Sequence, residues 1–396
     1  MIKVCVIGLG YVGLPILINL SKKYNTIGYD NNFERVRNLK KGIDIFNEIN
    51  KNDLSKIRTT YTTIVDKVKS CNLFIVTVPT PVFPNKKPNL GHLKDVCLKI
   101  SKILKKKDII IFESTVYPGL TNDFCIKILE KKSKLIEGKD FFVGYSPERV
   151  NPGDKKHSLK NINKILAYPH HYMKKDIKRM YSFIGKKLIL TNNIKEAETA
   201  KVIENIQRDV NIGLINEFYL VCNKLNINFD NVINLASTKW NFLKFKPGLV
   251  GGHCLPVDPY YLSHISKKNK IQTKITLAGR SINDSMATVI EKKILDKIKK
   301  IEHKNKRVII CGLSYKKDVA DLRNSLSLKI FNNINKKHKD IKGFDPLINI
   351  EISKKKKLVT SVNDLYKFDI FIVLTNHTKL SSILKKLRNK TIFYPI

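Results

Sequence analysis

The stretch GLVGGHCLPVD, residues 248–258, combines a thiol and a carboxylate at a spacing that could serve catalysis. Cys254 lies among glycines, and Asp258 follows four positions later. Glycines let a backbone approach a ligand closely, and a thiolate attacks carbonyl carbon readily. We predict that Cys254 is a nucleophile and that Asp258 orients or deprotonates a water molecule. His253 could lower the pKa of the thiol, although a histidine beside glycines is more often a structural hydrogen-bond partner.

Polar residues elsewhere could complete such a site. Lys201 and Asn205 are four residues apart in an expected helix, so they share one face. A cation and an amide there could hold a developing oxyanion, whereas a solvated helix face is the alternative. Glu148, in SPERV, follows an expected strand. It could be a general base or a substrate contact, and a surface salt bridge would explain it equally well.

The N-terminal segment carries a dinucleotide-binding pattern. GLGYVG, residues 8–13, follows an apolar strand and opens a helix, and Asp30 lies 22 residues beyond Gly8. The glycines permit a tight turn, approach of a pyrophosphate and close helix packing, and the carboxylate can accept hydrogen bonds from a ribose, which favours NAD over NADP. A glycine turn of another sheet protein is the alternative. The predicted cofactor-binding residues are Gly8, Gly10, Tyr11, Val12, Gly13, Asp30, Arg35, Thr80 and Thr115.

Three of these residues have a second interpretation. Arg35 could stack near the adenine or lie on the surface. Thr80 and Thr115, in TVPTP and ESTVYPG, follow expected strands. They lie at the edge of an open sheet where ligands bind, so they could contact cofactor or water, but hydroxyl caps of proline-shaped loops are also possible.

The elements that must position these residues alternate between strands and helices. Continuous apolar blocks predict strands at 2–7, 26–30, 72–81, 108–119 and 141–153, which is typical of a parallel sheet covered on both faces. Apolar residues at helical spacing predict long helices over about 194–236 and 274–300. The first pattern then returns: VIICGLS at 308–314, GFDPL at 343–347 and IFIVLTNHT at 370–378 resemble VCVIGLG, GYDNN and LFIVTVPTP.

This order predicts an α/β protein with two Rossmann-like, doubly wound parallel-sheet domains joined by a long central helical region. The expected domains are 1–190 for NAD, 191–300 for helical dimerisation and the cysteine loop, and 301–396 for a second Rossmann-like domain. The turn of the second sheet domain is GLSYKKD instead of GxGxxG. We therefore expect it to hold a different anion.

Composition restricts the class of protein. The 396 residues include 42% apolar residues, enough for two or three domains. No signal peptide or membrane span is expected, which predicts a soluble, cytoplasmic protein without a membrane partner. Seven widely spaced cysteines without CxxC argue against disulfides and against a metal site. The formal net charge is +40, but the lysines are dispersed, as an AT-rich genome would produce. We predict no specific nucleic-acid partner, although the charge should attract an anionic substrate.

Seven motifs in order resemble the UDP-glucose/GDP-mannose dehydrogenase family across essentially the whole chain. They are GLGYVGLP, VPTP, ESTVYPG, SPERVNPGD, KVIENIQRDVNI, PGLVGGHCLPVDPYYL and GLSYKKDVADLRNS. NPGDKKH and TKWNFLKFKPGLVGGHC are most similar to UDP-N-acetylhexosamine 6-dehydrogenases of the Vi-antigen and O-antigen type. The resemblance implies NAD bound by the first domain, a homodimer through the central helix, and a UDP-sugar bound by the third domain.

The resemblance also implies a mechanism. A sugar C6 alcohol is oxidised to a carboxylate with two NAD, through a thiohemiacetal and a thioester on Cys254. Lys201 and Asn205 stabilise the oxyanion, Asp258 is the base or orients water, and Glu148 and Thr115 assist at the hydrolytic water. The loop 241–252 covers the nucleotide sugar. The implied substrate-binding residues are Glu148, Arg149, Lys201, Asn205, Phe242, Gly248, Gly251, Lys316 and Arg323. The last two match residues that contact the substrate or organise the loop in which they lie.

Several points stay open at the level of sequence. UDP-N-acetylglucosamine is the first choice of substrate, followed by UDP-N-acetylgalactosamine or UDP-N-acetylmannosamine, and then UDP-glucose. The product would enter surface polysaccharide biosynthesis. The chain stops at KTIFYPI, where family members usually continue into a short tail. The exit of the last strand and a contact near the uracil could be missing, or the proline could be a tolerated end. The alternative function is a noncatalytic, nucleic-acid-binding or scaffolding protein on the same fold.

Overall fold

The computed structural model describes residues 2–46, 49, 51–55, 57–150, 159–302, 306–356, 358–387 and 390–396. The motif NPGDKKH and the end of the strand expected at 141–153 lie outside this part of the chain. The chain forms two compact units. The first comprises Met1–Glu204 and Tyr260–Gln272, and the second comprises Asn205–Pro259 and Thr273–Ile396.

The first unit is built on an eight-stranded sheet of order β3-β2-β1-β4-β5-β6-β7-β8. All neighbours pair in parallel except β6 and β7, which are antiparallel at Tyr145 and Ala167. The strands are β1 (Lys3–Ile7), β2 (Asn25–Tyr29), β3 (Thr59–Thr62), β4 (Leu73–Val76), β5 (Ile109–Phe112), β6 (Phe142–Tyr145), β7 (Asn163–Ala167) and β8 (Lys187–Thr191).

Helices cover this sheet because its central strands are apolar on both faces. Every residue of β4, β5 and β6 is buried. Helix α6 (Lys174–Ile184) buries Ile177, Met180, Tyr181 and Ile184, a helical spacing that forms one apolar stripe. That stripe and α1 (Gly13–Ser21) belong to one hydrophobic core with β1 and β4. The other helical segments are α2 (Phe33–Lys40), α3 (Lys51–Ser55), η1 (Val65–Val68), α4 (Gly91–Ser101), η2 (Thr121–Ile126), α5 (Lys127–Ser133) and η3 (Leu159–Asn161).

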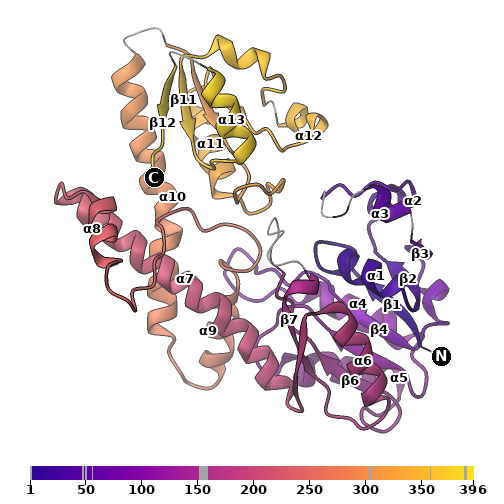
Figure 1. Ribbon diagram of the computed structural model, residues 1–396. Helices are drawn as coiled ribbons and strands as arrows, with labels where there is room; N and C mark the ends of the chain where they lie inside the picture. Colours follow the sequence, from indigo (N-terminus) through magenta and orange to yellow (C-terminus); the bar gives the residue numbers. More distant parts are fainter. Residues whose placement is uncertain are drawn as a thin grey trace. The chain divides into compact units, whose positions relative to one another are not determined.

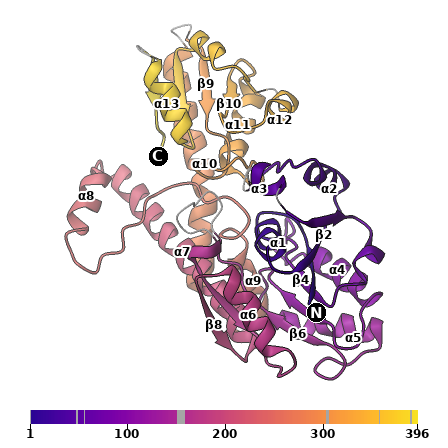
Figure 2. The same cartoon turned by 45° about the vertical axis from the view of Figure 1, so that its right-hand side comes forward.

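The second unit contains a four-stranded parallel sheet of order β10-β9-β11-β12. Alternate strand residues enter two cores, one with α10 and α11 and the other with α13. Figure 2 shows β9 beside β10, with α11 and α13 near them. The elements are α10 (Lys274–Glu302), β9 (Val308–Cys311), α11 (Leu326–Lys337), β10 (Lys342–Phe344), α12 (Ile350–Lys355), η4 (Asn363–Lys367), β11 (Ile370–Val373), α13 (Thr378–Lys386) and β12 (Thr391–Phe393).

The predicted α/β fold class, with two parallel-rich sheets and long central helices, is confirmed (Figure 1). The single helix expected over about 194–236 is instead two, α7 (Ile194–Lys224) and α8 (Phe229–Ala236). The break has a local cause: Asn226 has φ +56°, and the Asn228 side chain caps α8 by accepting from Asn231 N. Strands β3, β7 and β8 were not predicted. Among the described residues, no helix is long and apolar enough to cross a membrane.

Candidate active site

The turn after β1 has the geometry that a dinucleotide requires. Gly8 has φ +93°, and a Cβ added to Gly13 would lie 1.9 Å from Gly8 O, so no side chain fits there. A Cβ added to Gly10 would meet nothing within 4 Å, which leaves space for a ligand beside the backbone. Thr77 Oγ1 donates to Gly8 O at 2.7 Å and holds the turn against the end of β4. These residues fit a bound pyrophosphate.

Asp30 lies directly after β2 and is tied to the same turn. Its Oδ2 accepts from Leu9 N at 2.8 Å, and its Oδ1 accepts from Asn32 N at 2.9 Å. The carboxylate therefore has a defined position at the carboxyl edge of the sheet, where a ribose hydroxyl would be bound. Together with Gly10, it gives the first unit a site that fits NAD.

Arg35 forms a side-chain hydrogen bond to the backbone of the glycine turn after β1. Its side chain is buried, and Nε donates to Leu9 O at 2.8 Å while Nη1 contacts Asp44 at 2.7 Å. The guanidinium also lies 4.7 Å from the centre of the Phe46 ring, which in turn packs on the Tyr11 ring. The surface alternative for Arg35 is therefore wrong. Its contact with the adenine stays a prediction.

The loops after β4 and β5 are joined by one of the predicted threonines. Thr80 Oγ1 donates to Thr115 O at 2.6 Å, and both residues are half-buried. The hydroxyl of Thr80 therefore acts as a loop cap in this structure. Val12 directly precedes α1 as its N-cap residue.

Glu148 follows β6 and is buried within the first unit. Its Oε1 accepts from Arg149 N at 2.7 Å and from Val150 N. Its Oε2 is buried without a hydrogen-bond partner among the described residues, and the same holds for Ser146 Oγ. Arg149 forms an ion pair with Glu204 at 2.5 Å. An orphaned buried carboxylate oxygen is costly, so Glu148 is the kind of group that a ligand or water would satisfy.

A buried polar cluster that sequence analysis missed lies behind Glu148. Lys164 Nζ, on β7, contacts Glu113 Oε2 at 2.5 Å and Pro147 O at 3.4 Å. Tyr181 OH, on α6, donates to Glu113 Oε1 at 2.9 Å. Burial raises the pKa of the Glu113 carboxyl, although Lys164 acts in the opposite direction. The only feature of the sequence that pointed to this cluster was Lys164 itself, a charged residue directly before the apolar residues ILA.

Helix α7 contributes residues to both units. Lys201 belongs to the first unit and is buried there. Three residues earlier, Glu198 accepts from Gly119 N at 2.5 Å and Thr121 N at 3.0 Å, which fixes the loop that follows β5. Asn205 belongs to the second unit. Both Lys201 and Asn205 lie on the continuous helix α7, four residues apart, as predicted from the sequence.

The second unit holds the predicted thiol and its partners. Cys254 is exposed, whereas the other six cysteines are buried. Its carbonyl accepts from Val257 N and Asp258 N, at 2.9 and 3.0 Å, in the turn that opens α9 (Asp258–Lys268). Asp258 is buried, and its Oδ2 accepts from Asn205 Nδ2 at 2.5 Å. The structure therefore brings Asn205 to Asp258, four residues beyond the thiol.

The loop before Cys254 is anchored from α7. Asn216 is fully buried, donates from Nδ2 to Gly248 O at 3.1 Å and accepts from Gly248 N at 2.8 Å. The same amide donates to Asn283 Oδ1 at 2.8 Å on α10. Phe242 is half-buried in this loop. A side chain with this role was not predicted, because 32 residues separate Asn216 from Gly248.

The turn after β9 repeats the turn after β1. Gly312 N donates to Phe344 O at 2.9 Å, as Gly8 N donates to Tyr29 O at 2.8 Å. Asp345 Oδ2 accepts from Leu313 N at 2.8 Å, which is the bond that Asp30 makes with Leu9 N in the first unit. The similarity noted between the two halves of the sequence therefore corresponds to a repeated structure.

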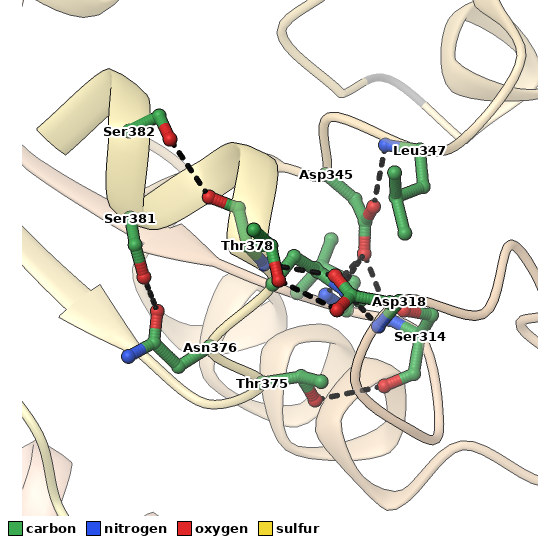
Figure 3. A network of polar contacts seen from close by, with 11 residues as sticks. Ser314, Asp318, Asp345, Leu347, Thr375, Asn376, Thr378, Ser381 and Ser382 are labelled. Atoms are coloured by element: carbon green, nitrogen blue, oxygen red, sulfur yellow. Dashed lines mark hydrogen bonds and ion pairs between the residues drawn. The ribbon is translucent and has the colours of Figure 1, made fainter. Parts of the chain in front are cut away.

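A histidine distinguishes the second turn. His377 is fully buried; its Nδ1 accepts from Asp318 N at 2.8 Å, and its Nε2 lies 2.8 Å from Ser314 Oγ and 3.2 Å from Asp345 Oδ2. Figure 3 shows Ser314, Asp318 and Asp345 converging in this network. Burial alone would raise the pKa of the Asp345 carboxyl, but the bonds from His377 and the backbone outweigh it and lower that pKa.

This network holds the segment 312–325, which contains the predicted substrate contacts Lys316 and Arg323. Lys316 is half-buried, and Arg323 pairs with Asp321 through Nε and Nη2, the latter at 2.8 Å. Lysine and arginine at a backbone turn are groups that bind phosphate. The described part of the chain contains no cluster of three or more His, Cys, Asp or Glu side chains suited to a metal ion.

Three family models match the chain in succession. They describe the NAD-binding domain (residues 2–184), central domain (195–285) and UDP-binding domain (309–395) of the UDP-glucose/GDP-mannose dehydrogenase family. A UDP-N-acetyl-D-glucosamine 6-dehydrogenase of Salmonella typhi is 38% identical over 388 residues, covering 96% of this chain and 91% of that protein. The enzyme of the same name from Pseudomonas aeruginosa is 41% identical over 354 residues, covering 88% and 84%.

A solved structure shows the same fold and family. The UDP-D-ManNAc dehydrogenase of Pyrococcus horikoshii superposes with a TM-score of 0.84 at 30% identity, covering 99% of this chain and 94% of that one. The first unit therefore contains an NAD-binding domain, and the second contains a UDP-sugar-binding domain. The chain belongs to the UDP-glucose/GDP-mannose dehydrogenase family and is an NAD-dependent nucleotide-sugar 6-dehydrogenase.

Proposed function

We propose that the chain oxidises the C6 hydroxyl of UDP-N-acetylglucosamine to the uronic acid in a four-electron reaction that uses Cys254. The observation that carries this proposal is the arrangement of Cys254, Asp258 and Asn205: an exposed thiol beside a buried carboxylate that an amide orients. Bound NAD supplies the chemistry of hydride acceptance, and the turn around Gly10 with Asp30 holds it.

The thiol makes the second oxidation possible. Cys254 Sγ adds to the C6 aldehyde and forms a thiohemiacetal, which loses hydride and a proton to become a thioester. Water then attacks the thioester carbon, the C–S bond breaks, and carboxylate and thiol are released. Lys201 and Asn205 donate to the developing oxyanion. Asp258, with Glu148 and Thr115, orients and deprotonates the water.

The substrate assignment is supported by the relatives. Those named for UDP-N-acetyl-D-glucosamine share 38% and 41% identity with the chain, against 30% for the structure named for UDP-D-ManNAc. We therefore place UDP-N-acetylglucosamine first and UDP-N-acetylmannosamine second, with UDP-N-acetylgalactosamine and UDP-glucose after them. A uronic acid made in this way is a precursor for an acidic surface polysaccharide.

Substrate contacts would come from the loop 241–252 and the turn after β9. We propose that Phe242, Gly248 and Gly251 cover the sugar and that Lys316 and Arg323 bind the pyrophosphate. Glu148 and Arg149 are proposed to contact the sugar as well. The division into a 1–190 NAD domain, a 191–300 helical region and a 301–396 nucleotide domain stays our functional proposal, and the order of the family models supports it.

We also propose a homodimer through α7. Leu214, Phe218 and Val221 form a stripe at helical spacing on this helix, and Leu225 follows directly after its last residue; each is about half-exposed or more. An apolar stripe of this kind favours a protein interface. Light scattering of the wild type beside Phe218→Glu tests it: we expect a dimer that the charge dissociates. A wild-type monomer would refute the proposal.

NADH formation with UDP-N-acetylglucosamine tests the reaction. We expect two NADH per sugar in the wild type and none in Cys254→Ala. UDP-N-acetylmannosamine, UDP-N-acetylgalactosamine and UDP-glucose serve as competing substrates, compared by kcat/KM. A higher kcat/KM with an epimer would replace the substrate while keeping the mechanism. One NADH per sugar in the wild type would refute the thioester route.

A further inference from the structure

The loop that carries the thiol is bound to the segment that carries the proposed nucleotide contacts. We call residues 248–254 the thiol loop and residues 312–325 the nucleotide loop; both belong to the second unit. Gly252 N donates to Asn324 O at 3.3 Å, and Asn324 Nδ2 donates to Gly252 O at 3.3 Å. Two reciprocal hydrogen bonds therefore join the loops, and both are made between Gly252 and Asn324.

Glycines allow this close contact. A Cβ added to Gly251 would lie 2.8 Å from Asn324 O, and one added to Gly252 would lie 2.7 Å from the Tyr315 ring. Gly252 also has φ +93°, a backbone conformation that disfavours other residues. The two loops consequently touch at backbone level, so that a shift of one displaces the other.

A side-chain bridge runs parallel to the backbone contact. Asp321 is buried, and its Oδ2 lies 3.2 Å from His253 Nε2 and accepts from Arg323 Nη2 at 2.8 Å. Arg323 N and Nε donate to its Oδ1 at 2.9 and 3.0 Å. Burial alone would raise the pKa of the Asp321 carboxyl, but these hydrogen bonds outweigh it and lower that pKa. Asp321 is therefore an ionised group shared between a histidine of one loop and an arginine of the other.

We propose that His253 is a positioning residue that couples nucleotide occupancy of the nucleotide loop to the reactivity of Cys254. This inference rests on the proposed function, in which Arg323 contacts the pyrophosphate and Cys254 is the nucleophile. A phosphate bound to Arg323 competes with Asp321 for the guanidinium. Asp321 then redistributes its hydrogen bonding toward His253, which precedes Cys254 directly in the chain.

Alkylation of the thiol measures this coupling. Cys254 is the exposed cysteine and the other six are buried, so iodoacetamide should label Cys254 selectively, and Cys254→Ala should take up little label. The labelling rate is measured with and without saturating UDP, which has the nucleotide but no hexose. In the wild type we expect UDP to change the rate by at least about fivefold, the lower range of typical allosteric coupling.

Variants separate coupling from direct shielding by UDP. In His253→Ala the two rates should agree within about twofold, while His253→Asn, which retains a hydrogen-bonding group for Asp321, should restore part of the difference. His92→Ala, an exposed histidine on α4, is the matched control and should behave as the wild type. Calorimetric titration with UDP and circular dichroism establish that each variant folds and binds nucleotide.

The outcomes distinguish the two proposals. An equal UDP effect in the wild type and His253→Ala would overturn the coupling, and so would the lack of any UDP effect in a wild type that binds UDP and produces two NADH per sugar. Failure of the wild type to bind UDP or to oxidise a UDP-sugar would instead count against the proposed function on which the coupling rests.

Discussion

Asn205 Nδ2 donates a hydrogen bond to Asp258 Oδ2 at 2.5 Å, although 53 residues separate the two. The carboxylate fixes the direction of the amide, and the amide satisfies one oxygen of a carboxylate that is almost fully buried. The residues that we assign to the oxyanion and to the hydrolytic water therefore act as a pair.

Replacing either member of this pair should damage the same function. We expect Asn205→Ala and Asp258→Ala each to lower kcat/KM by at least about tenfold, and the double variant to be only slightly worse than the poorer single variant. The reason is that each change breaks the same contact, and contacting residues couple by about 0.5–3 kcal/mol. Steady-state NADH formation for the four proteins gives the coupling energy. Strictly additive losses would show that the two residues act independently.

Asp30 should control cofactor affinity. Its carboxylate is positioned by Leu9 N and Asn32 N, and a charged hydrogen bond to ribose is worth about 1.5–3 kcal/mol. Asp30→Ala should therefore raise the KM for NAD by roughly ten- to a hundredfold. It should also reduce the ratio of kcat/KM with NAD to kcat/KM with NADP. Initial rates at varied NAD and NADP measure this. An unchanged KM in a folded variant would argue that Asp30 only holds the turn.

The buried pair Glu113–Lys164 should be costly to break from one side. Lys164→Met leaves Glu113 without its cation, and a change of this kind costs about 3–5 kcal/mol. We expect a clear loss of stability in urea unfolding, partly recovered when Glu113→Gln is added. The exposed pair Asp95–Lys99 is the control: Lys99→Met should cost less than about 1 kcal/mol. Equal losses at the two pairs would contradict this prediction.

Close packing within the second unit makes Gly213 irreplaceable. A Cβ added to Gly213 on α7 would lie 2.7 Å from Gly279 O on α10. Although alanine gains up to about 1 kcal/mol in helix propensity, overpacking costs about 1–3 kcal/mol. We therefore expect Gly213→Ala to lower the melting temperature, whereas Glu217→Ala, an exposed position on the same helix, should not. A higher melting temperature for Gly213→Ala would mean that α7 and α10 can move apart to accommodate the methyl group without loss of stability.

Asp209 should make stability depend on pH. It contacts Arg280 and Asn283, and burial raises the pKa of its carboxyl from 3.8 to about 6, although Arg280 acts in the opposite direction. Between these values the folded chain retains a proton that the unfolded chain has released. The contribution of Asp209 to stability is therefore complete below pH 3.8 and falls by up to about 3 kcal/mol as pH rises through 6.

Asp209→Asn removes this titration and provides the test. The melting temperature of the wild type minus that of the variant should decrease between pH 4 and pH 7 and level off above that range. Differential scanning calorimetry in matched buffers measures both proteins. A difference that stays constant across the range would place the pKa of Asp209 at its ordinary value.

Features that depend on neighbours in the chain were predictable from sequence. Gly8, Gly10 and Gly13 form a turn because glycine has local backbone freedom. The position of Asp30 beside that turn was predictable because one helix and one strand of ordinary length separate the two. The fold class and the repeat of the turn at Gly312 follow from the same local patterns. Such features are determined within about thirty residues, so spacing alone describes them.

Partners that are distant in the chain were decided only by the tertiary structure. Lys164 on β7 contacts Glu113, which follows β5, because only β6 separates these two strands in the sheet. No local pattern specifies the cation that a buried carboxylate will meet. Asn216 is bound to Gly248 and His253 to Asp321 across 32 and 68 residues. Sequence alone determined which residue types are available for the chemistry. Packing determined which of these residues form hydrogen bonds and ion pairs with one another. The reason is that a hydrogen bond requires its two atoms to lie within about 3 Å, whatever their separation along the chain.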